Sequence, residues 1–388
     1  MLENSRSVTR RITGRAATAL AAAVLTAPLL ALATPAQAAT GPTASVTLGD
    51  SYISGEAGRW KGNSVVTSGS RAGTDRAWNG SSYDPSRAYG TSYANGCDRS
   101  DSAEVRSATG IAQTQINLAC SGAVSANVFR AANGGQSYKG ELPQADQLAA
   151  VAAANDVKLI TLSIGGNDLG FADVIETCVK DYLIWYSYCH DDQQEAVDSR
   201  MPAAMAGVGK SIDEIRAVMS TAYSSSAYRI VLQSYPSPIP RGADMRYSES
   251  GWSRADTGGC PFWNGDADWA RSSLVPQISD ELAKVAKAKG VQFLDLRDML
   301  AGREVCSKAT KQATSTTAPS ATTSEWARFV DAYLSASQGD TRESMHPNYY
   351  GQLALGRCLT LLWAKPTGDQ SCRNTVYQDA TGMYLTAR

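Results

Sequence analysis

Histidine is scarce in this chain: its 388 residues include two, His190 and His346. A serine hydroxyl is a poor nucleophile near neutral pH unless a neighbouring base takes its proton, and imidazole is the side chain most often used for this. Any chemistry that depends on an activated serine therefore has two candidate bases. His190 follows Cys189 and precedes two aspartates. We interpret His190 as an exposed loop residue and not as a metal ligand, because this stretch offers too few ligands for a metal.

Three familiar motifs are also missing. The sequence contains no C-x-x-C and no H-E-x-x-H, and its histidines do not cluster with its cysteines. This argues against a zinc site, so we expect no metal. The absence of G-x-S-x-G argues against the nucleophile elbow of the α/β-hydrolase fold.

The chain has little excess charge, with 36 basic and 37 acidic residues. A balance this even gives no reason to expect a nucleic-acid partner. The N-terminus is locally basic, continues into an Ala/Leu-rich stretch at 16–33, and ends at Ala36-Gln37-Ala38. This pattern predicts a secretory signal peptide over residues 1–39, with a membrane anchor as the alternative. No later segment is long and apolar enough to span a bilayer, so we expect no stable membrane insertion. We expect the mature protein to be extracellular and monomeric.

All eight cysteines follow the predicted leader. An even number of cysteines in an exported chain favours disulfides over metal ligation. The sequence leaves their connectivity open, and nearest-neighbour pairing is the simplest arrangement. It would join Cys97–Cys120, Cys178–Cys189, Cys260–Cys306 and Cys358–Cys372. Each such bridge is expected to stabilise the fold by about 2–4 kcal/mol.

Strand-like and helix-like segments alternate along the chain. We expect strands at 44–48, 116–119, 157–164, 228–233 and 291–296, and helices at 141–154, 211–223, 279–289 and 347–363. Alternation of this kind predicts a three-layer α/β/α sandwich with a mainly parallel, five-stranded sheet. The polar segments 59–96 and 311–324 are interpreted as surface loops within a single domain, 40–388.

Polar residues follow the predicted strands. Ser51 follows the first strand, Gly122 the second and Asn167 the third, while His346 begins the last helix. Ligand sites of open parallel sheets form beyond the carboxyl ends of the strands, so these residues are expected to converge. Ser51 could then attack a carbonyl while His346 takes its proton. The backbone N–H groups of Ser51 and Gly122, with the Asn167 amide, could hold the resulting oxyanion.

These ordered motifs resemble those of the SGNH (GDSL) hydrolases. The resemblance rests on Gly49-Asp50-Ser51-Tyr52, on Gly122, on Gly165-Gly166-Asn167-Asp168 and on His346-Pro347, and extends over about 46–356. It is greatest to secreted lipases, esterases and phospholipases of filamentous actinobacteria. The resemblance implies a flavodoxin-like sheet and serine-dependent hydrolysis of carboxylic esters, chiefly of lipids, without a metal or an organic cofactor.

One position departs from the family pattern. The family usually has an Asp three residues before the histidine, where this chain has Glu343. Either the Glu343 carboxylate orients the imidazole, or a backbone carbonyl such as that of Ser344 does so.

Other functions remain open from the sequence. A phospholipase A/B and a carbohydrate acetyl or feruloyl esterase are alternatives within the same chemistry. A secreted glycan-binding module on an inactive scaffold is the non-enzymatic alternative, suggested by the Tyr/Gly/Ser-rich stretch 81–95. The aromatic stretch 182–188 is consistent either with a wall or lid over an acyl chain or with a packing element.

Overall fold

The computed structural model describes residues 41–64, 73–184, 187–223, 227–330 and 341–388. They belong to one compact unit of the chain, Ala36–Arg388. The predicted signal peptide, 1–39, lies outside the described residues. Within them, no helix has both the length and the apolar composition needed to span a membrane.

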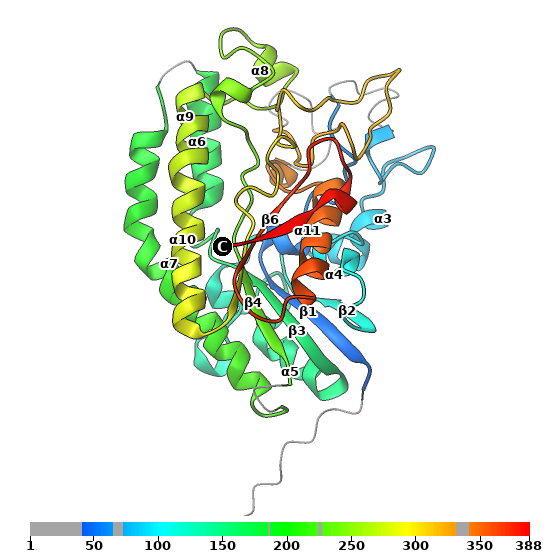
Figure 1. The fold of residues 1–388 in the computed structure, drawn as a ribbon, viewed down its shortest axis with the longest axis vertical. Coiled ribbons are helices and arrows are strands. Elements are labelled where there is room, and N and C mark those ends of the chain that lie inside the picture. The colour runs from blue at the N-terminus through cyan, green and yellow to red at the C-terminus, as the bar shows by residue number, and fades with distance from the viewer. Residues whose placement is uncertain (1–40, 65–72, 185–186, 224–226, 331–340) are drawn as a thin grey trace, which may run out of the picture. The chain divides into compact units, whose positions relative to one another are not determined.

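A seven-stranded sheet with the strand order β2-β1-β3-β4-β5-β6-β7 forms the centre of this unit (Figure 1). The strands are β1 (Thr43–Gly49), β2 (Thr114–Asn117), β3 (Asp156–Ser163), β4 (Arg229–Gln233), β5 (Gln292–Asp295), β6 (Gln370–Arg373) and β7 (Tyr384–Ala387). Neighbours from β2 to β6 pair in parallel, and β7 pairs antiparallel with β6. The predicted α/β fold with a mainly parallel sheet is therefore confirmed.

The predicted number of strands, five, is wrong. The five predicted strands correspond to β1–β5, and two more follow the last long helix. Both additional strands are four residues long: β6 is mostly polar, and β7 is mostly exposed. β7 is the edge strand and β6 lies between it and β5. Neither strand therefore has the longer apolar run that marks β3.

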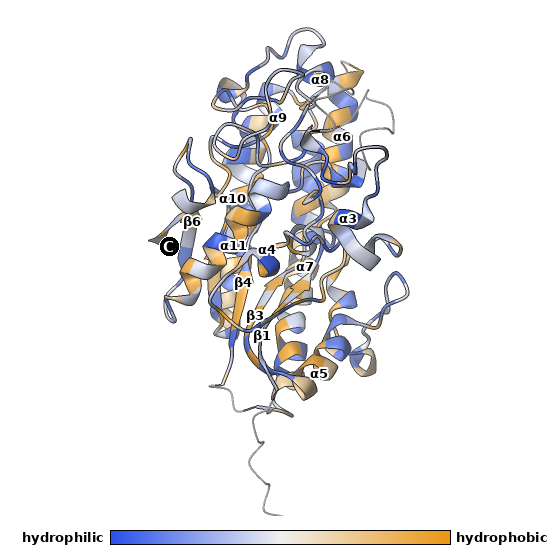
Figure 2. Cartoon of the chain, turned by 90° about the vertical axis from the view of Figure 1, so that its right-hand side faces the viewer, coloured by the Kyte–Doolittle hydropathy of each residue, from blue (hydrophilic) through white to orange (hydrophobic). Residues whose placement is uncertain are grey.

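The inner strands are buried on both faces. Val46 and Leu48 of β1, and Leu159 and Ile160 of β3, are at most 1% exposed, and β1 and β3 pair along most of their length. In Figure 2, β1, β3 and β4 are coloured mainly as hydrophobic. Burial of both faces explains the nearly continuous apolar run of β3, and it fixes the position of the loops that follow these strands.

Helices cover both faces of the sheet (Figure 1). One layer contains α5 (Gln144–Ala154), α7 (His190–Met219) and α10 (Val275–Lys289); the other contains α4 (Glu104–Ser107) and α11 (Tyr349–Trp363). The remaining α-helices are α1 (Ser51–Ser54), α3 (Ser86–Tyr89), α6 (Phe171–Leu183), α8 (Ser253–Asp256) and α9 (Asn264–Trp269).

Helix α7 begins 21 residues before the helix expected at 211–223. Its first two turns are strongly polar and its middle contains Pro202, Gly207 and Gly209, residues that weaken a helix prediction. Contacts with α5 and α10 supply the packing that the local sequence does not indicate.

The eight cysteines form four disulfides, Cys97–Cys120, Cys178–Cys189, Cys260–Cys306 and Cys358–Cys372. This is the nearest-neighbour arrangement considered from the sequence. Cys97–Cys120 joins the long segment 59–96 to the loop that follows β2, so it positions two segments near the end of β1.

Candidate active site

Ser51 is the first residue of the short helix α1, directly after β1. Gly49 has φ +138°, and a Cβ at this position would lie 1.9 Å from the carbonyl oxygen of Ser163. No other residue fits this turn, which lifts Ser51 above the end of the sheet. The Asp50 carboxylate accepts a hydrogen bond from the Tyr52 N–H at 3.1 Å and caps the helix.

The same aspartate connects the Ser51 turn to the loop after β3. The Tyr235 hydroxyl donates to Asp50 Oδ2 at 2.5 Å and accepts from the Gly166 N–H at 3.1 Å. Burial raises the pKa of Asp50 to about 7, although its hydrogen bonds act in the opposite direction. Asp50 therefore braces the turn, and through Tyr235 and Gly166 it also fixes the position of Asn167 relative to Ser51.

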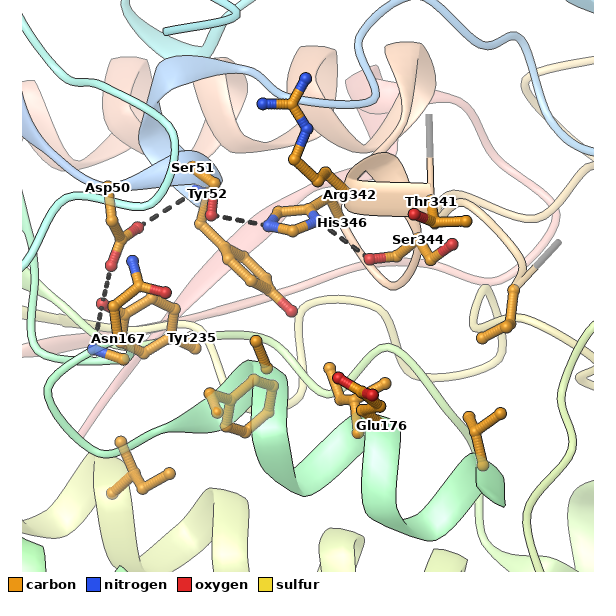
Figure 3. A pocket seen from close by; sticks show the side chains of 17 residues that line it. Asp50, Ser51, Tyr52, Asn167, Glu176, Tyr235, Thr341, Arg342, Ser344 and His346 are labelled. Carbon is orange, nitrogen blue, oxygen red and sulfur yellow. Dashed lines mark hydrogen bonds between the residues drawn. The ribbon is translucent and has the colours of Figure 1, made fainter. Parts of the chain in front are cut away.

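His346 lies just before α11 and faces Ser51 (Figure 3). Its Nε2 is 2.7 Å from Ser51 Oγ, and its Nδ1 is 2.9 Å from the carbonyl oxygen of Ser344. A carbonyl can only accept a hydrogen bond, so Nδ1 carries the proton and Nε2 is left to accept the Ser51 hydroxyl. Burial lowers the pKa of His346 to about 4, so the ring is neutral at neutral pH and can take up a proton.

Glu343 does not contact the imidazole through its side chain. Its carboxylate is buried and accepts hydrogen bonds from Trp60 Nε1, at 2.8 Å, and from the Tyr89 hydroxyl. Of the two groups considered from the sequence, the Ser344 carbonyl is the one that is hydrogen-bonded to His346 Nδ1. The reason lies in the tertiary structure, because Trp60 and Tyr89, both from the segment 59–96, bind the Glu343 carboxylate.

We predict that Glu343→Gln leaves kcat for ester hydrolysis within about threefold of the wild type, because the amide oxygen can still accept from Trp60 Nε1 while the Tyr89 hydroxyl can accept from the amide NH2 group. Glu343→Ala should lower the free energy of unfolding by about 1–3 kcal/mol, because these buried donors lose an acceptor. Steady-state kinetics and chemical denaturation of both variants would test this. A folded Glu343→Gln enzyme with a hundredfold lower kcat would contradict the role assigned to Ser344.

Gly122 lies in the loop that follows β2. It has φ +82°, and a Cβ here would lie 2.6 Å from the Tyr138 hydroxyl oxygen, so both backbone and space require glycine. The preceding Ser121 N–H donates to the Cys97 carbonyl at 3.1 Å. Among the described residues, the Gly122 N–H has no hydrogen-bond acceptor, as an oxyanion donor requires before substrate binds.

Asn167 lines the same cavity as Ser51 and His346 (Figure 3). Its Nδ2 donates to the Ala123 carbonyl at 2.9 Å, which uses one of its two N–H bonds and ties it to the Gly122 loop. Asp168 does not cap the helix that follows it. It instead accepts from the Ser125 hydroxyl at 2.6 Å, and Gly170 occupies the N-cap of α6. Both side chains thus hold the loops after β2 and β3 together.

A cavity of about 440 Å³ opens beside Ser51 and His346. Its far wall is mainly apolar and includes Phe171, Ile175, Val179, Ile278 and Val330, with Glu176 as a charged residue of the same lining (Figure 3). Three of these apolar residues lie on one side of α6, a helix whose extent and apolar face the sequence analysis did not give. Their spacing of four residues is a helical signal that could have located this wall.

The aromatic stretch 182–188 is not part of the cavity lining in its described residues. Tyr182 is buried and packs against Trp263, whereas Ile184 and Tyr188 are more than half exposed. Trp185 and Tyr186 lie outside the described residues. For Tyr182, the packing interpretation is correct.

His190 is the first residue of α7 rather than an exposed loop residue. Its Nδ1 is 2.7 Å from Asp266 Oδ1, and its side chain is 29% exposed. Asp266 lies close to Cys178 and Cys189, but these two cysteines are joined in a disulfide and cannot supply thiolate ligands. Of the two histidines, His346 and not His190 is hydrogen-bonded to Ser51.

Comparisons with known proteins agree on one family. The family model described as GDSL-like lipase/acylhydrolase matches residues 88–354. A protein named lipase, from Streptomyces rimosus, is 29% identical over 307 residues, which is 77% of this chain and 87% of that protein.

Two solved structures from Streptomyces species also match. The extracellular lipase from Streptomyces rimosus has 25% sequence identity and a TM-score of 0.43, with 82% of this chain and 98% of that chain covered. Phospholipase A1 from Streptomyces albidoflavus NA297 has 22% identity and a TM-score of 0.46, with 83% and 98% covered.

Proposed function

The chain belongs to the GDSL-like lipase/acylhydrolase family and is an ester hydrolase, and we propose that it cleaves carboxylic esters of lipids through an acyl-enzyme on Ser51. The observation that carries this proposal is the 2.7 Å contact between Ser51 Oγ and His346 Nε2 at the polar end of an apolar cavity. A nucleophile, its base and space for an acyl chain then lie side by side.

In the proposed first step, Ser51 Oγ attacks the ester carbonyl carbon and its proton passes to His346 Nε2. The bond between Nδ1 and the Ser344 carbonyl keeps the ring in the required tautomer and orientation. The carbonyl oxygen becomes an oxyanion, which accepts hydrogen bonds from the backbone N–H groups of Ser51 and Gly122 and from the Asn167 amide.

The intermediate then collapses. His346 returns its proton to the leaving alcohol as the carbon–oxygen bond breaks, and the acyl group remains on Ser51. A water molecule, deprotonated by His346, attacks the acyl carbon in the second half-reaction, which releases the carboxylic acid and restores the Ser51 hydroxyl.

The apolar wall favours a lipid acyl chain over a sugar ester. Phe171, Ile175 and Val179 offer no hydrogen-bond donors or acceptors in their side chains, whereas a sugar hydroxyl buried against them would lose its bonds to water. Each methylene of an acyl chain gains about 0.8 kcal/mol on burial. A phospholipid and a triacylglycerol both meet this requirement.

We also propose that the protein acts outside the cell. Four disulfides among the described residues suit an oxidising compartment. The basic and Ala-rich segment at 1–39 supports export as a cleaved signal peptide.

The acyl-chain assignment predicts a change in chain-length preference when the cavity is shortened. Ile175→Trp should lower kcat/KM for a hexadecanoyl ester about 10- to 60-fold relative to that for a butanoyl ester, because two or three methylenes lose their apolar contact. Rates on p-nitrophenyl esters of both lengths would measure this ratio.

Thr177→Trp is the matched control, because it lies on the same helix but not in the cavity lining. It should leave the ratio unchanged. Equal losses on both esters in Ile175→Trp would contradict the assignment, and a preference of the wild type for acetylated xylan would favour a carbohydrate esterase instead.

A further inference from the structure

A buried carboxyl group that has no part in the steps above lies next to the dyad. Glu56 is 1% exposed, and its Oε2 is 3.9 Å from His346 Nε2. Its own N–H donates to the Ser51 carbonyl at 3.2 Å, so its backbone is fixed to the nucleophile turn. Glu56 does not line the cavity. It therefore approaches the dyad from the protein interior, where substrate does not reach.

The side chain of Glu56 connects the nucleophile turn to the Gly122 loop. The Ser121 hydroxyl donates to Glu56 Oε2 at 2.5 Å, and Ser121 directly precedes Gly122. The Ser121 carbonyl also accepts from Lys139 Nζ at 2.7 Å. The serine before the proposed oxyanion donor is thus held by its hydroxyl as well as by its backbone.

The site is an unfavourable one for a carboxyl group. Glu56 Oε1 is buried and has no hydrogen-bond partner among the described residues. Burial raises the pKa of Glu56 to about 8; the hydrogen bond from Ser121 and the charge of Arg342 act against this rise, and the nearby Asp98 and Glu343 contribute to it. A buried carboxyl group with an unpaired oxygen destabilises the fold. What the Glu56 side chain contributes to the site is therefore its hydrogen bond with Ser121.

We propose that Glu56 is a positioning residue, which holds the Ser121–Gly122 loop at a fixed distance from the Ser51 turn through its bond to the Ser121 hydroxyl. The two backbone donors of the oxyanion site lie on these two segments, so a small shift between them would misplace one donor. This inference rests on the proposed function and adds to it the connection that sets the donor geometry. Neutral Glu56 is sufficient, because only an acceptor oxygen is needed.

A different role would follow from its charge. An ionised Glu56 at 3.9 Å from the ring would stabilise the imidazolium that forms when His346 takes the proton. The two roles differ in what glutamine can replace: an amide oxygen can accept from Ser121, but it carries no charge.

The test is a double-mutant cycle with a conservative variant. Glu56→Ala and Ser121→Ala should each lower kcat about 10- to 100-fold with little change in KM, because the donors are misplaced in the transition state. The double variant should be no slower than either single variant, because the two side chains act through one bond. Glu56→Gln should stay within about threefold of the wild type.

Glu304→Gln is the matched control. Glu304 is another buried carboxyl whose pKa burial raises to about 7, and it is not in the cavity lining. It should leave kcat unchanged. If Glu56→Ala does not fold, Ser121→Ala alone still decides, since an unchanged kcat in that variant would overturn the proposal.

Three further results would overturn it. Glu56→Gln as slow as Glu56→Ala would assign the effect to charge. Additive losses in the double variant would show two independent effects, and a change in KM or stability alone would show a merely structural residue. Failure of the proposed function is distinguishable, because Ser51→Ala would then retain activity whatever the Glu56 variants do.

Discussion

Replacing Ser51 by alanine is expected to lower kcat for ester hydrolysis by about 10⁴-fold or more. The variant keeps the turn, because the cap of α1 is supplied by Asp50 and the turn itself by Gly49. It loses the nucleophile, Ser51 Oγ, which lies 2.7 Å from His346 Nε2 in the wild type. Initial rates on a chromogenic ester, with thermal unfolding to verify the fold, would measure the loss.

A covalent probe provides an independent readout for the same prediction. A fluorophosphonate should add one mass adduct to the peptide that contains Ser51 in the wild type, and none in Ser51→Ala. His346→Ala should react far more slowly, because the hydroxyl then lacks its base. Retained hydrolysis in Ser51→Ala would remove this residue from the mechanism, whereas a wild type without any esterase activity would favour the glycan-binding alternative.

Replacing Asn167 by alanine is expected to lower kcat about 10²- to 10³-fold, with a smaller effect on KM. Its amide contributes a donor whose bond strengthens as negative charge develops on the carbonyl oxygen, so the transition state loses more than the ground state. Asn167→Asp should be slower still, because it places a carboxylate of nearly the same shape where a donor is required. Single-turnover rates would separate this step from product release.

Asn127→Ala provides the control for Asn167. Asn127 is an amide in the same loop region, donates to the Gln136 carbonyl at 3.2 Å and does not line the cavity. It should affect stability but leave kcat nearly unchanged. Equal losses in the Asn127 and Asn167 variants would mean that loop integrity, and not an oxyanion donor, limits the rate.

The inner part of the fold could be predicted because burial leaves a strong pattern. Strands β3 and β4 lie between two helical layers and have apolar residues on both faces, and β1 has apolar residues at alternate positions. Strands β6 and β7 could not be found in this way, because each is four residues long; β6 is mostly polar, and β7 is the mostly exposed edge strand. Helix α6 did carry a periodic signal, in Phe171, Ile175 and Val179, and it forms the apolar wall.

The site divides in a similar way. The positions of Ser51, Gly122 and Asn167 follow from local order, since each comes directly after a parallel strand and such strands end at one edge. The partner of His346 did not follow from local order. Glu343 has the spacing of an orienting acid, yet Trp60 and Tyr89, more than 250 residues earlier, hold its carboxylate.

The sequence by itself indicated a serine ester hydrolase, because two histidines and four ordered motifs leave few ways to activate a serine. The tertiary structure alone decided which oxygen bonds to the imidazole Nδ1, which helix forms the apolar wall of the cavity, and that Glu56 lies 3.9 Å from His346. The physical reason is the distance along the chain over which each feature is determined. Turns and strand ends are determined by neighbouring residues, whereas the direction of a buried polar side chain is determined by the hydrogen-bond donors that the fold brings within about 3 Å of it.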